Sequence, residues 1–244
     1  MLKKGRKIII FALSLGLFLV ILVPKSRFEI EQIFFDLIYQ DSVITTTKEV
    51  DAVLASFPTI LQKDLPHNYL EQAGLNTTRF KKLSRKKFYV LRKRDLYRKI
   101  AGTVRIRDVF PVDGNTYSLT IFSGEKLYWG IDPAILYKVV ELRNILMSQD
   151  LDGDAFWVRY GHRHPALNEA VGGAPISRHI SGDALDLVIE DINNDGKADA
   201  LDKAIVLAIC EKRLIGNHGG IGRYPWSQTI HIDLRGRRAR WDSH

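Results

Sequence analysis

The chain has 244 residues, of which 45% are hydrophobic, enough to bury one core with a smaller appended domain. Its formal net charge of +8 indicates an anionic neighbour, and nucleic acid, a membrane surface and an anionic cell wall all satisfy that condition. The single cysteine, Cys210, excludes a disulfide framework within the chain. Its place in the apolar run 204–210 favours a buried small side chain over a nucleophile.

A basic and then apolar segment opens the sequence. Lysine and arginine at positions 3, 4, 6 and 7 precede an uncharged apolar run, 8–23. This run is shorter than the about 20 residues of a usual membrane span and fits the apolar region of a signal peptide. We favour an uncleaved anchor at 1–25, because no small-x-small cleavage site follows and flanking lysines can extend the run. Either alternative leaves the rest of the chain outside the cytoplasm, which argues against nucleic acid as a partner.

Residues 26–100 contain no motif that we can connect to chemistry, and we treat them as a membrane-proximal region of unknown role. Apolar positions in 28–39 and 50–65 are compatible with helices. Segment 79–99 carries 11 Lys or Arg against one acid. A solvated face explains this segment, and contact with anionic lipid headgroups or wall polymer is the alternative.

The second domain is expected over 101–244. Its first elements are β-rich stretches at 103–106 and 117–122, which flank a turn sequence at 113–115 and predict a hairpin. Asp132 and a following proline predict the start of a helix, with Asp132 as N-cap. The apolar stripe of this helix is Ile135, Val139, Leu142 and Leu146.

A histidine and a carboxylate then lie seven positions apart with a glycine between them. On one straight helix this separation is a rise of about 10 Å, too far for His179 and Asp186 to share a metal with bonds of roughly 2 Å. The chain must therefore turn between them, and Gly182 permits the turn. Segment 184–190 then predicts a strand whose apolar residues face away from Asp186.

A third ligand candidate lies on a strictly alternating segment, 229–234. Its apolar residues face a core, whereas His231 and Asp233 share the opposite face. Two such strands side by side would bring His179, Asp186 and His231 together, with a fourth position open. Two imidazoles and one carboxylate are the ligand count of a catalytic rather than a structural zinc.

The pattern S-x-H-x-x-G-x-A-x-D at 177–186, followed by H-x-D at His231, resembles the zinc D-alanyl-D-alanine peptidases of bacterial cell walls, peptidase family M15 with its Hedgehog/DD-peptidase fold. Flanking segments extend the resemblance over about 130–241. It implies an α+β domain with a small, mainly antiparallel sheet and flanking helices, and a strand at 156–160. It also implies zinc held by His179, Asp186 and His231, and a peptide of peptidoglycan as substrate.

The resemblance implies roles for three further residues. Arg163 corresponds to the family's substrate-binding arginine, whose guanidinium fork suits a carboxylate, and a surface ion pair is the alternative. Ser177 orients a neighbouring ligand or binds substrate. Asn168, grouped with the substrate-binding residues, braces the loop of Arg163.

The general base departs from the better-known branch of the family. Those enzymes carry Glu or Asp three residues before the last histidine, where this sequence has Gln228, which cannot take a proton. The sequence resembles instead a sub-branch ending in H-x-D that includes murein endopeptidases, and there Asp233 is the catalytic candidate beside Arg163. Support of a ligand or an ion pair with Arg235 is the alternative role of Asp233. Other possible proton carriers are His162, His164 and His218.

Segment 191–202 follows the calcium-loop pattern of EF-hands and dockerins, with oxygen side chains at positions 1, 3, 5, 9 and 12 and glycine at position 6. A helix over 201–213 is expected after it. A polar loop opening an acid-capped helix is the alternative. The expected calcium ligands are Asp191, Asn193, Asp195, Lys197 through its backbone carbonyl, Asp199 and Asp202.

These patterns predict a zinc metallopeptidase, either a DD-carboxypeptidase or a murein endopeptidase, anchored in a bacterial cytoplasmic membrane with its catalytic domain outside. The expected partners are peptidoglycan peptides and, through 1–25, the membrane. Because Gln228 replaces the usual acid, a non-catalytic relative that keeps the metal and binds cell wall or protein is the alternative.

Overall fold

A computed structural model describes residues 41–110 and 126–242. The anchor expected at 1–25, the helix expected at 28–39 and, from the expected hairpin, the turn at 113–115 and the strand at 117–122 lie outside these residues. No helix in the described parts is both long and apolar enough to cross a membrane. By its contacts the chain divides after Ser42, and the elements described below belong to the second unit.

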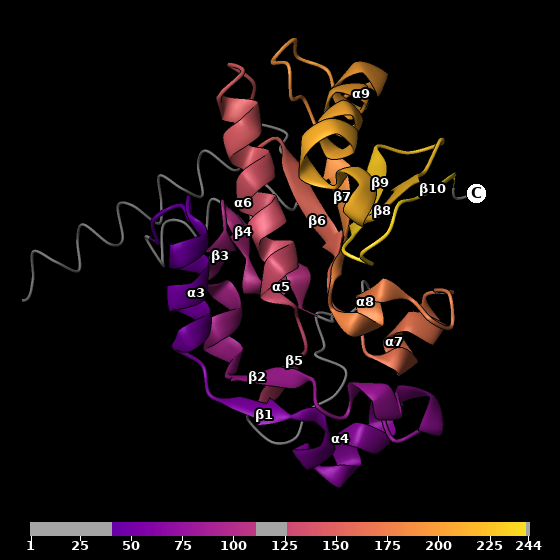
Figure 1. Ribbon diagram of the computed structural model, residues 1–244. Helices are drawn as coiled ribbons and strands as arrows, with labels where there is room; N and C mark the ends of the chain where they lie inside the picture. The colour runs from indigo at the N-terminus through magenta and orange to yellow at the C-terminus, as the bar shows by residue number, and fades with distance from the viewer. Residues whose placement is uncertain (1–40, 111–125, 243–244) are drawn as a thin grey trace, which may run out of the picture. The chain divides into compact units, whose positions relative to one another are not determined.

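The larger sheet has five strands and confirms the expected α+β class with a small, mainly antiparallel sheet (Figure 1). Neighbouring strands are antiparallel except β10 and β8, which run parallel. The strands expected at 156–160, 184–190 and 229–234 are all present. In spatial order the strands are β10 (Ala239–Asp242), β8 (Gly220–Arg223), β9 (Thr229–Asp233), β7 (Ala184–Ile189) and β6 (Phe156–Tyr160).

Two helices, α6 (Pro133–Met147) and α9 (Ala200–Ile209), pack with the apolar residues of β7 and β9 in one core. Asp132 is the N-cap of α6 as expected, and its carboxylate accepts a hydrogen bond from the Ala134 amide at 3.0 Å. All four residues of the predicted stripe are fully buried. A π-helical turn, Cys210–Leu214, extends α9, and Cys210 is buried as expected. The sheet face opposite this core carries Asp186 and His231.

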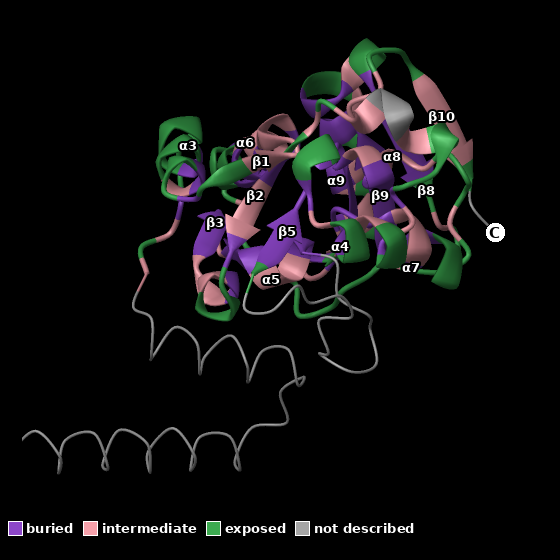
Figure 2. Cartoon of the chain, turned by 90° about the horizontal axis from the view of Figure 1, so that it is seen from below, coloured by how far each residue is buried: buried purple, intermediate pink, exposed green. Residues whose placement is uncertain are grey.

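Apolar residues of 44–57 and 91–110 pack on the same core, so the packing continues across the boundary expected at residue 100. A second, smaller core consists of Leu65, Tyr69, Ala73, Leu75, Phe88 and Tyr128. Figure 2 shows β3 and β5 buried, whereas α3 presents exposed residues. This part contains the sheet β1 (Thr59–Leu61), β2 (Lys87–Leu91) and β5 (Leu127–Trp129), the pair β3 (Lys99–Ala101) and β4 (Val104–Arg105), the helices α3 (Thr47–Ala55), α4 (His67–Gln72) and α5 (Ile106–Val109), and the 3-10 turns η1 (Gln62–Asp64), η2 (Thr78–Leu83) and η3 (Lys93–Tyr97).

Two expectations for this part were wrong in detail. The helix expected over 50–65 ends at Ala55, because Pro58 disfavours helical backbone at the residue before it, and 59–61 is a strand. The strand expected over 103–106 is only β4, which pairs with the preceding β3. It stops because the Asp108 carboxylate accepts the Arg105 amide at 2.8 Å and thereby begins α5.

Candidate metal centre and its pocket

His179 is placed by the one-turn helix α8 (Arg178–Ser181). Ser177 is the N-cap of this helix, and its hydroxyl accepts the His179 amide at 3.3 Å. Gly182 ends the helix with a φ of 73°, and a Cβ at this position would lie 2.0 Å from the Gly130 carbonyl oxygen. Only glycine fits, so the predicted turn between the first two ligand candidates is confirmed.

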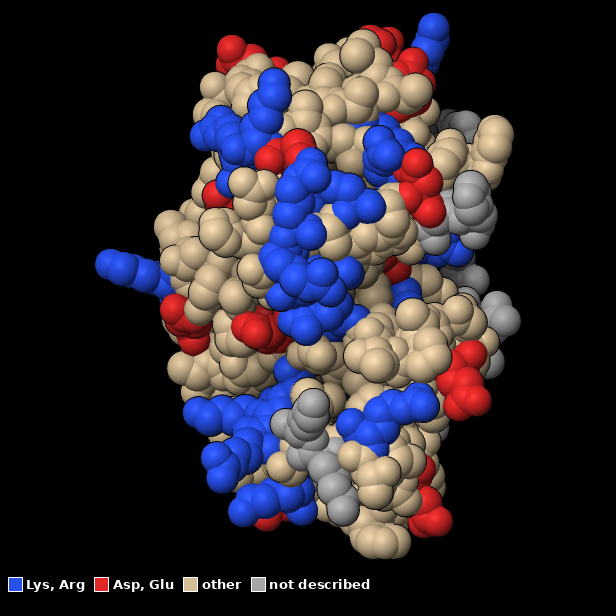
Figure 3. All heavy atoms as spheres, turned by 45° about the vertical axis from the view of Figure 1, so that its right-hand side comes forward, with Lys and Arg blue, Asp and Glu red and all other residues tan. Residues whose placement is uncertain are grey.

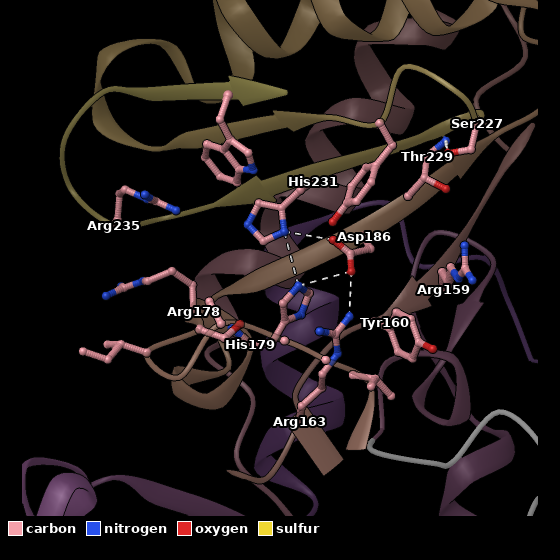
Figure 4. A pocket seen from close by; sticks show the side chains of 18 residues that line it. Arg159, Tyr160, Arg163, Arg178, His179, Asp186, Ser227, Thr229, His231 and Arg235 are labelled. Carbon is pink, nitrogen blue, oxygen red and sulfur yellow. Dashed lines mark hydrogen bonds and ion pairs between the residues drawn. The ribbon is translucent and has the colours of Figure 1, made fainter. Parts of the chain in front are cut away.

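Asp186 and His231 face each other as register partners on β7 and β9. The His231 Nδ1 lies 2.9 Å from Asp186 Oδ1, and the His179 Nε2 lies 3.2 Å from His231 Nδ1 and 3.3 Å from Asp186 Oδ2 (Figure 4). Four tetrahedral ligands with bonds of roughly 2 Å are separated by about 3.3 Å. These three side chains are the only such group of His, Cys, Asp or Glu found among the described residues.

Hydrogen bonds on the outer side of each imidazole fix which nitrogen faces the centre. The His179 Nδ1 lies 2.7 Å from the Gly161 carbonyl oxygen, which can only accept, so this nitrogen carries the proton. The His231 Nε2 lies 3.1 Å from Asp233 Oδ2 and donates likewise. The inner nitrogens therefore direct lone pairs toward the Asp186 carboxylate, an arrangement that a cation stabilises and that fits a metal.

The charge on Asp186 agrees with this arrangement. Burial alone would raise the pKa of its carboxyl group, but in the absence of a metal the His179 and His231 rings can carry a proton toward it and hold the pKa well below its ordinary value. A bound cation would take the place of these protons. Burial lowers the pKa of His179, which favours the neutral ring that a metal requires.

Arg163 lies beside this centre, in the loop that follows β6. Its Nη2 lies 2.7 Å from Asp186 Oδ2, and its guanidinium stacks 4.0 Å from the centroid of the Tyr160 ring. Its side chain is buried, its Nε has no hydrogen-bond partner, and it lines the pocket described below. Arg163 is therefore not in a surface ion pair. It has donor capacity left for a ligand in the pocket.

Asp233 is fully buried and its carboxylate is surrounded by donors. Besides His231, it accepts the amides of Gly220 at 3.1 Å and Arg235 at 3.0 Å and a two-pronged contact from the Arg235 guanidinium. It does not line the pocket. Of the two roles that the sequence left open for Asp233, this geometry favours the support of His231.

The other expected proton carriers also lie outside the pocket lining. Gln228, which cannot carry a proton, is also outside the lining, and its side-chain amide donates to the carbonyl of Asp199. His162 is buried against Phe88, and its Nδ1 accepts the Gly130 amide at 3.3 Å. His164 is the N-cap of α7 (Pro165–Ala170), and His218 ends the short helix η5 (Gly216–His218). Asp186 is thus the only carboxylate among the described residues that line the pocket.

The pocket has a volume of about 650 Å³ and opens on the sheet face that carries Asp186 and His231. Ser177 lines it, in agreement with its expected place. Asn168 does not: its side-chain amide is buried and donates to the Ala174 carbonyl at 2.9 Å, and its backbone carbonyl accepts the Gly173 amide. It therefore braces the loop that forms one pocket wall.

The sequence did not indicate several other residues of the lining. Trp241 packs on the His231 ring with centroids 5.2 Å apart, and Arg235 stacks on Trp241 from 4.8 Å. Arg159 and Tyr160 line the pocket from β6. An aromatic or arginine beside a strand gives no local signal of this role, because the neighbours it contacts are remote in sequence.

Segment 191–202, for which a calcium loop was predicted, forms a tight turn before a helix. Asn194 and Gly196 take left-handed backbone conformations, and the helix expected over 201–213 follows as α9 and its extension. The acids of the loop bind backbone amides: Asp191 accepts from Asp195 and Gly196. The carboxylates of segment 191–202 form no group of three whose ligand atoms lie as close together as those of His179, Asp186 and His231.

Asp202 is buried at the end of this loop. Its two oxygens accept the amides of Ile192, Asn193 and Asp199, and Asp199 in turn caps α9. These contacts are those of a polar loop opening a capped helix, which was the alternative from sequence. Calcium binding stays a prediction.

The family model described as Peptidase M15 matches residues 124–233, which is under half of the chain. The matched stretch contains all three candidate ligands as well as Arg163 and the walls that 171–177 and 224–229 contribute to the pocket. Comparisons with curated proteins and with solved structures found no match. A buried His-Asp-His centre at the floor of an open pocket is typical of a metallohydrolase. The match makes the class more specific: this part of the chain is similar to the M15 peptidases, which are zinc-dependent.

Proposed function

We propose that the chain is a zinc-dependent peptidase whose ion is held by the inner nitrogens of His179 and His231 and by Asp186. The observation that carries this proposal is the pair of outer hydrogen bonds, which place the proton of each neutral ring on its outer nitrogen and leave the inner nitrogens at tetrahedral separations. When bound, zinc supplies Lewis-acid activation of the scissile carbonyl and of water.

The residues around the centre divide the remaining tasks. Arg163 presents free donors to a substrate carboxylate while it holds Asp186 in place. Asp233 and Arg235 fix the ring of His231, and Ser177 fixes the start of the helix that carries His179. Asn168 keeps the glycine-rich pocket wall close to the centre.

The substrate that we propose is a peptide of the bacterial cell wall, cut by either DD-carboxypeptidase or murein endopeptidase action. The net charge of +8 supports an anionic polymer as partner. Figure 3 shows Lys and Arg side chains gathered in a band over the middle of the face that it draws. A location outside the cytoplasmic membrane, with 1–25 as its anchor, belongs to the same proposal and depends on the sequence alone.

A second function is favoured by one observation. Asp186 is the only carboxylate that lines the pocket among the described residues, so no acid stands ready there as a general base. A relative that keeps the zinc and binds wall peptides without cleaving them also fits this arrangement.

Incubating the full chain, in detergent and with zinc, with purified peptidoglycan separates the two functions. Peptide products identified by mass and absent with Asp186→Ala support the peptidase. Sedimentation of the chain with peptidoglycan, without release of products, supports the binding protein. If the chain neither releases products nor sediments with peptidoglycan, both functions are contradicted. Asp64→Ala removes an exposed carboxylate outside the pocket and is the matched control.

A further inference from the structure

A β-bulge shapes the pocket wall formed by β6, the edge strand of the five-stranded sheet. Val158 pairs with Leu187 and Tyr160 pairs with Asp186, so Arg159 is the extra residue without a partner on β7. In a regular strand Arg159 and Tyr160 would face opposite sides of the sheet. Because of the bulge, both line the pocket.

Arg159 differs from the other arginines in the pocket lining because its charge is not paired with a carboxylate of a described residue. Arg163 pairs with Asp186, Arg178 with Asp183 and Arg235 with Asp233. Arg159 is exposed and makes no ion pair with a described residue. Its positive charge is therefore available to a molecule in the pocket.

Tyr160 brings this charge close to Arg163. The guanidinium carbons of Arg159 and Arg163 lie 5.7 Å and 4.0 Å from the centroid of the Tyr160 ring, and Figure 4 shows the ring between the two side chains. Two guanidinium groups on either side of one ring can each hold a separate carboxylate. A ligand with two carboxylates would use both.

We propose that Arg159 determines specificity by binding a second carboxylate of the substrate, distinct from the one held by Arg163. This inference rests on the proposed peptidase function. Arg159 lies on β6, the neighbour of the strand β7 that carries the metal-ligand candidate Asp186. Neighbouring strands lie about 4.8 Å apart, and an extended peptide advances by at most about 3.5 Å per residue, so one or two peptide residues cover the distance between the two strands. The preferred substrates are therefore peptides with an acidic side chain one or two residues from the residue that carries the scissile carbonyl.

The test uses acetylated pentapeptides that end in D-Ala-D-Ala and carry Glu or Gln at one of the two preceding positions. We expect the wild-type chain to cleave one Glu peptide about tenfold faster in kcat/KM than its Gln counterpart. Arg159→Gln removes this preference, so that the Glu and Gln peptides are cleaved at equal rates, and Arg159→Lys retains part of it. Arg223→Gln removes an arginine charge outside the pocket lining and keeps the full preference.

The outcomes separate this inference from the proposed function. Equal cleavage of Glu and Gln peptides by the wild type overturns the role of Arg159 and leaves the peptidase in place. If no peptide is cleaved, calorimetric titration of the same peptides into the zinc-loaded chain decides. Tighter binding of a Glu peptide that is lost in Arg159→Gln supports the inference, and equal binding overturns it.

Discussion

Arg163 and Asp186 form a buried ion pair in which Nη2 lies 2.7 Å from Oδ2. The same guanidinium stacks on Tyr160 and lines the pocket, so one side chain touches both the metal centre and the space for substrate. Removing one partner of such a pair leaves a buried charge without compensation. Variants at Arg163 therefore test the centre and the pocket together.

Arg163→Lys should lower kcat/KM on carboxylate-bearing peptides by about tenfold or more, because a point charge replaces a two-pronged donor. Zinc content should stay close to one per chain, since the ligands are unchanged. Steady-state kinetics with metal analysis checks both. Unchanged kinetics would place Arg163 outside the substrate site.

The zinc proposal predicts that His179→Ala, Asp186→Ala and His231→Ala each remove both the metal and the activity, because each leaves only two protein ligands. The measurement is zinc per chain by elemental analysis after dialysis. Asp64→Ala should keep the wild-type content. Full zinc in all three ligand variants would end the proposal.

Asp233→Asn separates the two roles considered for Asp233. If it supports His231, the loss of its charge should weaken zinc affinity about 10- to 100-fold while saturating zinc restores kcat. Competition with a zinc chelator and kinetics across zinc concentrations measure these quantities. A kcat that stays low at saturating zinc would instead show a direct catalytic role.

His164 should make stability depend on pH. Its buried Nδ1 accepts the Leu167 amide at 3.1 Å, and burial lowers the pKa of its ring to about 4 from an ordinary 6.5. The folded state therefore favours the neutral ring. The stability that this contributes is present above pH 6.5 and is lost as the pH falls toward 4, by at most about 3 kcal/mol.

Urea unfolding of wild type and His164→Asn across this range measures that contribution. Asparagine is a good N-cap and does not titrate. As the pH falls from 7 to 4, the free energy of unfolding of the wild type should decrease more than that of His164→Asn. A difference that is constant from pH 7 to pH 4 would show that His164 is not the group responsible.

Calcium, if the loop at 191–202 binds it, should raise the thermal midpoint by mass action with zinc kept saturating. Asp195→Ala should abolish that rise. Asp202→Ala should lower the midpoint with or without calcium, because three backbone amides lose their acceptor. A wild-type midpoint that calcium does not move would show that the loop functions as a helix cap alone.

The sequence predicted the orientation of each ligand candidate because local rules determine it, whereas the pairing of the two strands that brings the candidates together was an assumption supported by the family resemblance. Strict alternation in 229–234 places His231 on the face opposite the core, and Gly182 is the residue that allows a turn after His179. The N-cap at Asp132 was predicted for the same reason. Each of these features depends on side chains a few residues apart.

The features that the sequence did not show depend on contacts between remote segments. The bulge at Arg159 arises where β6 shifts its register against β7, and no pattern in 156–160 marks it. The burial of Asp233 depends on Gly220 and Arg235 as well as on its own strand. The packing of 44–57 and 91–100 on the core of the second domain likewise joins segments without a shared motif.

Because Asp186 and His231 are register partners, metal binding also depends on the alignment of β7 with β9. A slip of one residue between β7 and β9 would turn one of these two side chains into the apolar core, so the ligand set exists only in the native alignment. A metal that binds this set adds its binding free energy to the correctly paired sheet alone. The time course of zinc uptake during refolding would therefore measure when β7 and β9 pair in the native register.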